Sequence, residues 1–104
     1  MSYPENLILG ENVDIGAFTY INAAYGVEIQ DNVQIGSHVS IYSDNSEDST
    51  HGNVVIRKNA KIGSHCVIFP EVEIGENARV GAHSVVKVDV PDDVTYTDHV
   101  LVKN

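Results

Sequence analysis

The histidines are the side chains of this sequence best suited to chemistry. His38, His65 and His83 each lie three residues after an aliphatic residue of a regular repeat, and Phe18 occupies the corresponding place earlier in the chain. If the repeats stack about 4.8 Å apart, the three imidazoles form one column on the outer wall. Stacked imidazoles disfavour one another's protonation, which leaves neutral rings able to act as bases or ligands. The alternative is a column that arose by repeat duplication and only packs against itself or a neighbouring subunit.

A further histidine, His51, lies in a polar insertion that has no aliphatic residue between Tyr42 and Gly52. We expect this segment to form an exposed loop with His51 at its tip. Loops on a rigid scaffold are a common place for functional residues, so His51 is a candidate general base. His99, near the end of the sequence, carries no distinguishing signal.

These histidines also raise the question of a metal site. Zinc requires three protein ligands that converge to about 2.0–2.1 Å from one point. Three histidines in a straight column on one wall cannot converge in this way, although two from one chain and one from a neighbour could. We therefore expect no metal and keep a zinc site as an alternative.

The elements that must position these side chains follow from a six-residue repeat of aliphatic residues. A period of six that regroups into eighteen predicts a solenoid of short strands with three flat faces per coil. An ordinary two-sheet sandwich would instead show period-two alternation. The twelve repeat positions are Leu9, Ile15, Ile21, Ile29, Ile35, Ile41, Ile56, Ile62, Ile68, Ile74, Val80 and Val86.

The repeat predicts about four coils over residues 9–91, in a single domain spanning residues 1–104. About two residues are inserted near Tyr25–Gly26, and a longer external loop occupies residues 42–55. Residues 92–104 break the repeat and are expected to form an extended tail over the open end or a neighbour. One corner of the coils should be a column of asparagines, which tolerate left-handed backbone angles: Asn12, Asn32, Asn59 and Asn77.

The charge of the chain is unevenly distributed. The net charge of −9 argues against nucleic-acid binding. Residues 1–56 contain no Lys or Arg, and five of the six basic residues fall in the last two coils. This placement is either chance or a sign that the later coils accept a phosphorylated cofactor. The five are Arg57, Lys58, Lys61, Arg79 and Lys87.

The cysteine count, the apolar runs and the chain length indicate the cellular compartment and the oligomeric state of the protein. The single cysteine, Cys66, excludes an internal disulfide, and its place in the repeat points it into the core. The sequence has no apolar run long enough for a signal peptide or a membrane span, so we expect a cytoplasmic protein with no membrane partner. A short solenoid of four coils buries little apolar surface per residue, which favours oligomerisation.

Residues 56–91 resemble the hexapeptide-repeat acyltransferases, and most closely the galactoside and maltose O-acetyltransferase branch. The resemblance rests on Ile62-Gly-Ser-His-Cys-Val-Ile-Phe-Pro-Glu-Val-Glu-Ile-Gly75 and Val80-Gly-Ala-His-Ser-Val-Val86. It implies an all-β fold, the left-handed parallel β-helix, and a homotrimer with active sites between neighbouring prisms. It also implies acetyl-CoA as donor and a hydroxyl or amine as acceptor, on a sugar, a sugar nucleotide or a similar small molecule.

In that branch, a histidine on the loop after the third face acts as the general base. The motif position falls near Ser46 in this chain, so His51, five residues further on, is the first choice for the catalytic base. His38, expected on the wall below the loop, is the second choice.

The resemblance also implies binding residues. Ser64 and Ala82 match small residues whose backbones line the pantetheine channel of CoA, and Lys87 lies near the CoA end of that channel. Asn22 resembles the asparagine that contacts the acceptor sugar. The only thiol faces inward, so direct transfer without an acyl-enzyme is expected.

Two other functions compete with the transferase. The first is a non-catalytic trimeric module, favoured by the absence of the motif histidine. The second is a zinc enzyme of the γ-class carbonic anhydrase kind, which shares the β-helix. Phe69–Pro70 stands where that family would have a second histidine.

Overall fold

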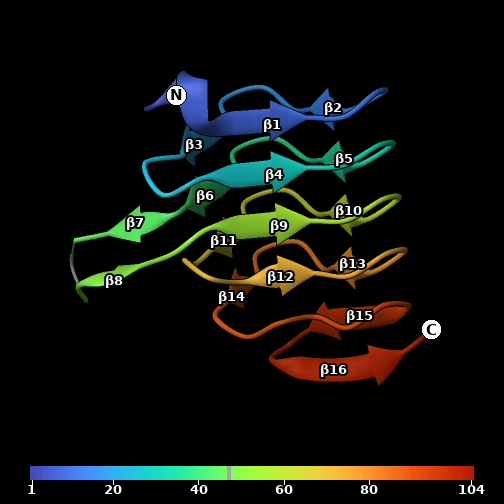
Figure 1. Cartoon of the computed structure of the whole chain (residues 1–104). Helices are drawn as coiled ribbons and strands as arrows, with labels where there is room; N and C mark the ends of the chain where they lie inside the picture. The colour runs from blue at the N-terminus through green and yellow to red at the C-terminus, as the bar shows by residue number, and fades with distance from the viewer. Residues whose placement is uncertain (47) are drawn as a thin grey trace.

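The computed structural model describes residues 1–46 and 48–104. After a short 3₁₀ turn, η1 (Pro4–Asn6), the chain winds through three sheets, parallel except for the last strand, that form the faces of a triangular prism (Figure 1). Face 1 contains β1 (Leu7–Leu9), β4 (Val27–Ile29), β9 (Val54–Ile56) and β12 (Glu73–Ile74). Face 2 contains β2 (Asp14–Ile15), β5 (Gln34–Ile35), β10 (Lys61–Ile62), β13 (Arg79–Val80), β15 (Val94–Thr97) and β16 (Val100–Lys103). Face 3 contains β3 (Tyr20–Asn22), β6 (Ser40–Tyr42), β11 (Val67–Ile68) and β14 (Val85–Val86).

The winding is left-handed, as the resemblance implied. In Figure 1 the chain crosses the front in face 1, returns behind through faces 2 and 3, and places each new coil below the last. This hand is the exception to the usual right-handed parallel crossover. The predicted fold class is therefore confirmed.

The repeat positions stack as the eighteen-residue period predicts. Ile35, Ile62 and Val80 are direct partners on adjacent strands of face 2, and each is buried. Cys66 is fully buried, as expected from its place in the repeat. Leu9 differs, since half of its surface is exposed (50%), because coil one has a neighbouring coil on one side only.

The corners of the prism hold left-handed residues in vertical columns. Between faces 1 and 2 the predicted asparagine column has φ of 57, 62, 63 and 60° at Asn12, Asn32, Asn59 and Asn77. Between faces 2 and 3 the column that contains the histidines has φ of 58, 60 and 62° at His38, His65 and His83. At this corner the N–H of each histidine donates to a carbonyl of the coil before, which holds the column in register.

Residues 92–104 form a hairpin that continues face 2. β15 lies parallel to β13, and β16 turns back antiparallel to β15. Tyr96 is buried at the end of the core, whereas all four residues of β16 are exposed. Within the described residues, no helix has the length and apolar character needed to cross a bilayer.

Candidate functional site

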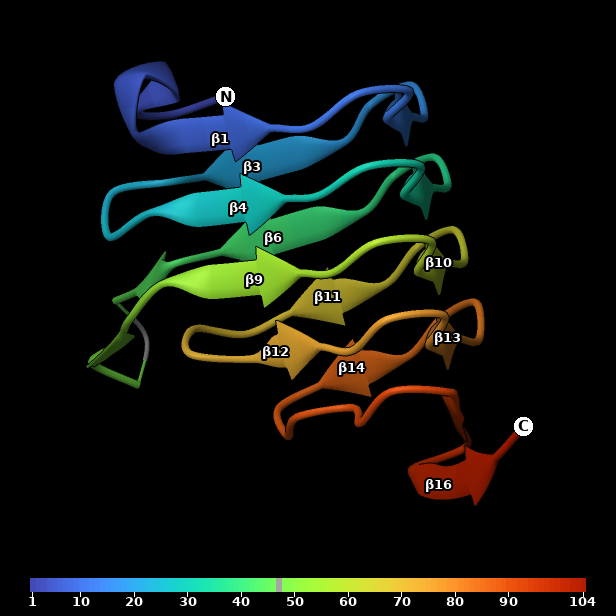
Figure 2. The ribbon, with the colours of Figure 1, turned by 45° about the vertical axis from the view of Figure 1, so that its right-hand side comes forward.

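The polar insertion forms a two-stranded arm, not the loop that the sequence suggested. β7 (Asp44–Asn45) pairs antiparallel with β8 (Thr50–His51), and the arm extends outward from the end of face 3 (Figure 2). The Asp48 carboxylate accepts hydrogen bonds from the backbone N–H (3.1 Å) and hydroxyl (2.6 Å) of Thr50. These bonds lower the pKa of Asp48 and close the turn locally, the usual role of Asp in such turns.

His51 lies near the base of this arm, so its expected place at the tip was wrong. Asp44 is its partner on the opposite strand, and the next residue, Gly52, donates its N–H to the Ser43 carbonyl (2.9 Å). The His51 ring stacks on Tyr25, with centroids 4.6 Å apart. Its ring nitrogens make no hydrogen bond to any described residue, which leaves them available to a ligand.

The base of the arm is fixed to the prism through a buried serine. The Ser43 hydroxyl donates to the Asn22 carbonyl (2.8 Å) and accepts from the Tyr25 N–H (2.9 Å). A fully buried hydroxyl with both roles satisfied holds the arm rigidly against coil one. The arm is therefore a positioned wall of the site.

Between the arm and face 3 lies a groove of about 410 Å³, here called the arm groove. Amide, carboxylate and hydroxyl groups line its arm side, and apolar side chains of β11 and its following corner form the rest. The Lys87 ammonium lies 4.8 Å from the centroid of the Phe69 ring, next to the groove. The groove is lined by Asn22, Tyr42, Asp44, Asn45, Ser46, Val67 and Phe69.

The predicted histidine column is present at the corner between faces 2 and 3. His38 and His65 stack with centroids 4.6 Å apart and nearly parallel rings, and His65 and His83 stack at 4.9 Å. Phe18 continues the column above His38 at 5.0 Å. All four rings are exposed, so one edge of each is open to a ligand or to a neighbouring subunit. In the described part of the chain, no three His, Cys, Asp or Glu side chains are grouped so as to hold a metal ion.

Ser64 and Ala82 lie at the same corner, directly before His65 and His83. The Ser64 carbonyl accepts from the His83 N–H (2.9 Å), whereas the N–H groups of Ser64 and Ala82 make no hydrogen bond to any described residue. Free backbone donors beside imidazoles can bind amide carbonyls or a developing oxyanion. The corner thus brings free backbone N–H donors next to exposed imidazoles.

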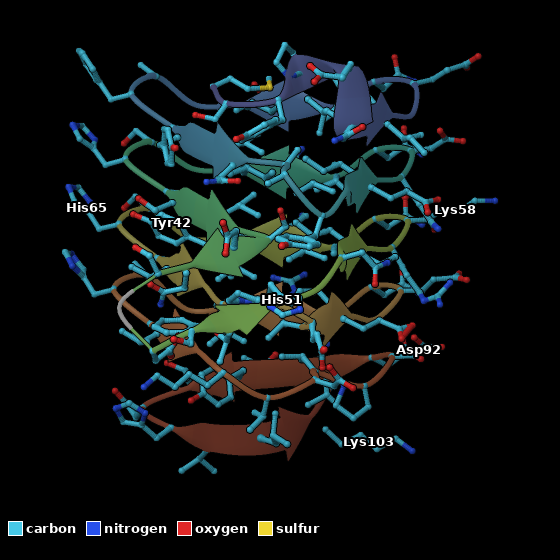
Figure 3. All side chains as sticks on the ribbon, turned by 60° about the vertical axis from the view of Figure 1, so that its left-hand side comes forward. Tyr42, His51, Lys58, His65, Asp92 and Lys103 are labelled. Carbon is cyan, nitrogen blue, oxygen red and sulfur yellow. The ribbon has the colours of Figure 1, made fainter. Side chains whose placement is uncertain are left out.

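The structure separates the sequence-predicted site residues into two groups. His38, Ser64 and Ala82 lie at the histidine corner, whereas the second group lies at the arm end of face 3: Asn22, His51 and Lys87. Five extended residues separate His38 from the base of the arm, a distance of about 16 Å. Figure 3 shows His65 at one edge of the prism and His51 on the arm in front. The expectation that His38 lies on the wall below the loop was therefore wrong, because the length of a face 3 strand separates the histidine corner from the start of the arm.

The sequence reasoning missed the aromatic and acidic residues of the arm groove. Tyr42 and Phe69 share the outward position that follows a repeat residue on face 3, a signal that the period alone contains. Asp44 and Asn45 had no such signal, because their place depends on the pairing of the arm.

Models of known protein families match the same repeats. One family model, "Bacterial transferase hexapeptide (six repeats)", matches residues 53–87. A second, "Hexapeptide repeat of succinyl-transferase", matches residues 6–43, so the two models together cover coils on both sides of the arm. Residues 6–43 and 53–87 of the chain therefore match hexapeptide-repeat families of transferases. Comparison of this hexapeptide-repeat protein with curated protein sequences gives no significant match.

Solved structures share the fold of this hexapeptide-repeat protein. AntD, an N-acyltransferase from Bacillus cereus in complex with dTDP-4-amino-4,6-dideoxyglucose and coenzyme A, is 29% identical over 94% of this chain with a TM-score of 0.83. The chain spans 62% of that AntD structure, less than two thirds of its length. Serine acetyltransferase from Brucella abortus strain S19 is 26% identical, with a TM-score of 0.70 over 86% of this chain and 36% of that one. A maltose O-acetyltransferase from Clostridium difficile 630 is 23% identical over 99% of this chain and 68% of its own, with a TM-score of 0.64, and shows the fold alone.

Proposed function

We propose that this chain is a CoA-dependent acyltransferase that moves an acetyl or similar acyl group to a hydroxyl or amine of a sugar or sugar nucleotide. The observation that carries the proposal is the histidine corner, where the free N–H groups of Ser64 and Ala82 adjoin exposed imidazoles. The solved relatives bound to coenzyme A and a dTDP-linked amino sugar support the same donor and acceptor classes.

At the corner, the free amides would bind the pantetheine chain of the donor and the thioester oxygen as it becomes negative. His38 or His51 would remove the acceptor proton while the acceptor oxygen or nitrogen attacks the thioester carbon and the CoA thiolate leaves. Burial raises the pKa of the Cys66 thiol, and its side chain is inaccessible. Direct transfer therefore fits this chain better than an acyl-cysteine intermediate.

The arm groove is the proposed acceptor site. Its polar arm side offers hydrogen bonds to hydroxyl groups, and its apolar side offers Phe69 and Val67 to the C–H face of a sugar ring. Asn22, predicted to contact the acceptor, lines this groove. His38 at the corner and the base of the arm are about 16 Å apart within one chain, too far for both to act at one reaction centre.

We therefore propose a homotrimer in which the histidine corner of one prism adjoins the arm of the next. Face 3 is suited to packing because its central outward residues carry no charge, whereas face 2 presents Asp14, Lys61 and Arg79 in the equivalent column. In a ring of three copies with heterologous contacts, each corner meets one arm and all three sites are equivalent. The uncharged column consists of Tyr20, Ser40, Val67 and Val85.

Calorimetric titration with acetyl-CoA tests the donor assignment. We expect one site per chain with micromolar affinity; absence of binding at millimolar ligand would favour a non-catalytic trimeric module. A screen of amino sugars, hydroxy sugars and their nucleotides with acetyl-CoA then tests the acceptor class. The cytoplasmic location stays a prediction, to be tested by cell fractionation.

Histidine variants test the base. Replacing the true base by alanine should lower turnover by about 10²–10⁴-fold and leave acetyl-CoA binding nearly unchanged. Glu11→Ala is the control, because Glu11 is exposed in the turn after β1, outside both groups, whereas His99 lines a small cavity with Ala82 and His83. If neither His38→Ala nor His51→Ala slows transfer, the base assignment is wrong.

A further inference from the structure

Two cations stand side by side on the outer surface of face 2. Lys61 and Arg79 are direct partners on the adjacent strands β10 and β13, so their Cβ atoms lie about 4.8 Å apart. Both are exposed, and neither makes an ion pair or a side-chain hydrogen bond to a described residue. Among those residues the ion pair that does form, Arg57 with Glu73, lies on face 1. Like charges directly opposite each other disfavour the unliganded sheet, so this pair is a place where an anion would bind.

The two cations border a shallow groove of about 480 Å³ along face 2, here called the basic groove. Its floor is smooth because Gly36, Gly63 and Gly81 have no side chain. Coil packing already requires such glycines, since a Cβ on Gly63 would lie 2.6 Å from the Ala82 nitrogen. Coil packing therefore accounts for the glycines of the floor. It does not account for the two unpaired cations at the border of the groove.

The basic groove leads directly to the histidine corner. Ser64 follows Lys61 by three residues, and Ala82 follows Arg79 by three residues, so each cation lies about 10 Å from a free corner N–H. A ligand with its phosphates on the cations would lie along the glycine floor and reach the corner with its remaining chain. Figure 2 shows β10 and β13 one above the other, on the side of the prism away from the arm.

We propose that the basic groove is a diphosphate subsite in which Lys61 and Arg79 bind the phosphates of a nucleotide. The favoured source is CoA, an assignment that rests on the proposed function, and the other source with the same chemistry is a nucleotide-linked acceptor. Lys87 is the weaker candidate for this role, because its ammonium contacts the Phe69 ring at the far end of face 3.

The test is an NMR and calorimetric titration of the full chain with three probes: inorganic pyrophosphate, CoA and dTDP. Pyrophosphate should shift backbone amides of β10 and β13 and leave those of the arm unchanged. Lys61→Gln and Arg79→Gln should each weaken CoA binding about fivefold, and the double variant about 25-fold, as expected for exposed charge pairs. Lys58→Gln is the control, because it removes an exposed cation from the same coil and should change the affinity less than about twofold.

The outcomes separate this subsite from the proposed function. Equal CoA affinity in the wild type and the double variant would overturn the subsite and leave the acyltransferase proposal intact. Binding of pyrophosphate and dTDP without CoA, lost in the double variant, would support the subsite, assign it to an acceptor nucleotide and remove the proposed donor. Absence of amide shifts in β10 and β13 with all three probes would overturn the subsite. The double variant should melt no lower than wild type, since removing adjacent like charges does not destabilise the free sheet.

Discussion

The proposed sharing of one active site between two subunits makes a quantitative prediction about mixed assemblies. Two variants are needed, each of which damages one group of site residues. In the first, residues 44–51 are replaced by Asn-Gly, which fits because the Gly52 N–H already donates to the Ser43 carbonyl, the closing bond of a two-residue hairpin turn. In the second, Ala82→Trp places a large ring on the exposed histidine corner and blocks the donor.

The expected activity follows from how the sites are composed. The armless variant keeps an intact corner, and the Ala82→Trp variant keeps an intact arm. A site in a mixed trimer is therefore intact only when the armless variant supplies its corner and the Ala82→Trp variant supplies its arm. In an equal, random mixture each condition holds for half of the copies, so about one quarter of the sites in a heterologous ring are intact. Each variant alone forms no intact site and should have background activity. If both groups acted within one chain, mixing would restore nothing.

The assay is acetyl transfer after the two variants are refolded together in equal amounts, compared with each variant refolded alone. Mass spectrometry of the intact assemblies confirms that mixed trimers have formed. Activity near one quarter of wild type supports the shared site. Background activity in mixtures that contain mixed trimers would refute the reasoning that the corner and the arm belong to one site.

Three further predictions concern the scaffold and the arm. Ile68→Ala removes a fully buried side chain and should lower the free energy of unfolding by about 2–5 kcal/mol in urea denaturation, whereas Ile68→Val should cost only about 0.5–1.5 kcal/mol. Gly63→Ala should cost about 1–3 kcal/mol, because its Cβ would meet the backbone of Ala82 in the next coil; an unchanged melting temperature would contradict this contact. The hydrogen bonds from Thr50 lower the pKa of Asp48 below its ordinary 3.8, so the stability that they give to the arm is present above that value and is lost as the pH falls through the lower folded pKa. The protection factor of the Thr50 amide, its exchange rate relative to the intrinsic rate at the same pH, should therefore fall as Asp48 is protonated, and Asp48→Asn should abolish that pH dependence.

The sequence predicted the features of the structure that depend on the repeat. The interior position of Cys66, the asparagine corner and the stacking of His38 on His65 all follow from placing equivalent residues on successive coils. Each depends only on the eighteen-residue period and on strand spacing, so one sequence with no further information predicts them. The hand of the helix came from family resemblance, since the period is the same for either hand.

The arm was not predictable in the same way, because it lies outside the repeat. The composition of residues 42–52 indicated a polar protrusion, but its strand pairing depends on the Asp48–Thr50 hydrogen bonds at one end and on Ser43 at the other. These contacts place His51 against Tyr25, a residue 26 positions earlier in the sequence. Local composition contains no information about that pairing.

The repeat by itself therefore determined which side chains share a column, and hence the histidine corner and the adjacent cations Lys61 and Arg79. Only the tertiary structure decided which columns lie near each other and where the insertion packs. It placed His38 and His51 at opposite ends of face 3 and formed the arm groove between the arm and that face. The physical reason is that a periodic pattern sets the spacing of residues along and between strands, whereas the place of an insertion is set by non-periodic hydrogen bonds and ring contacts.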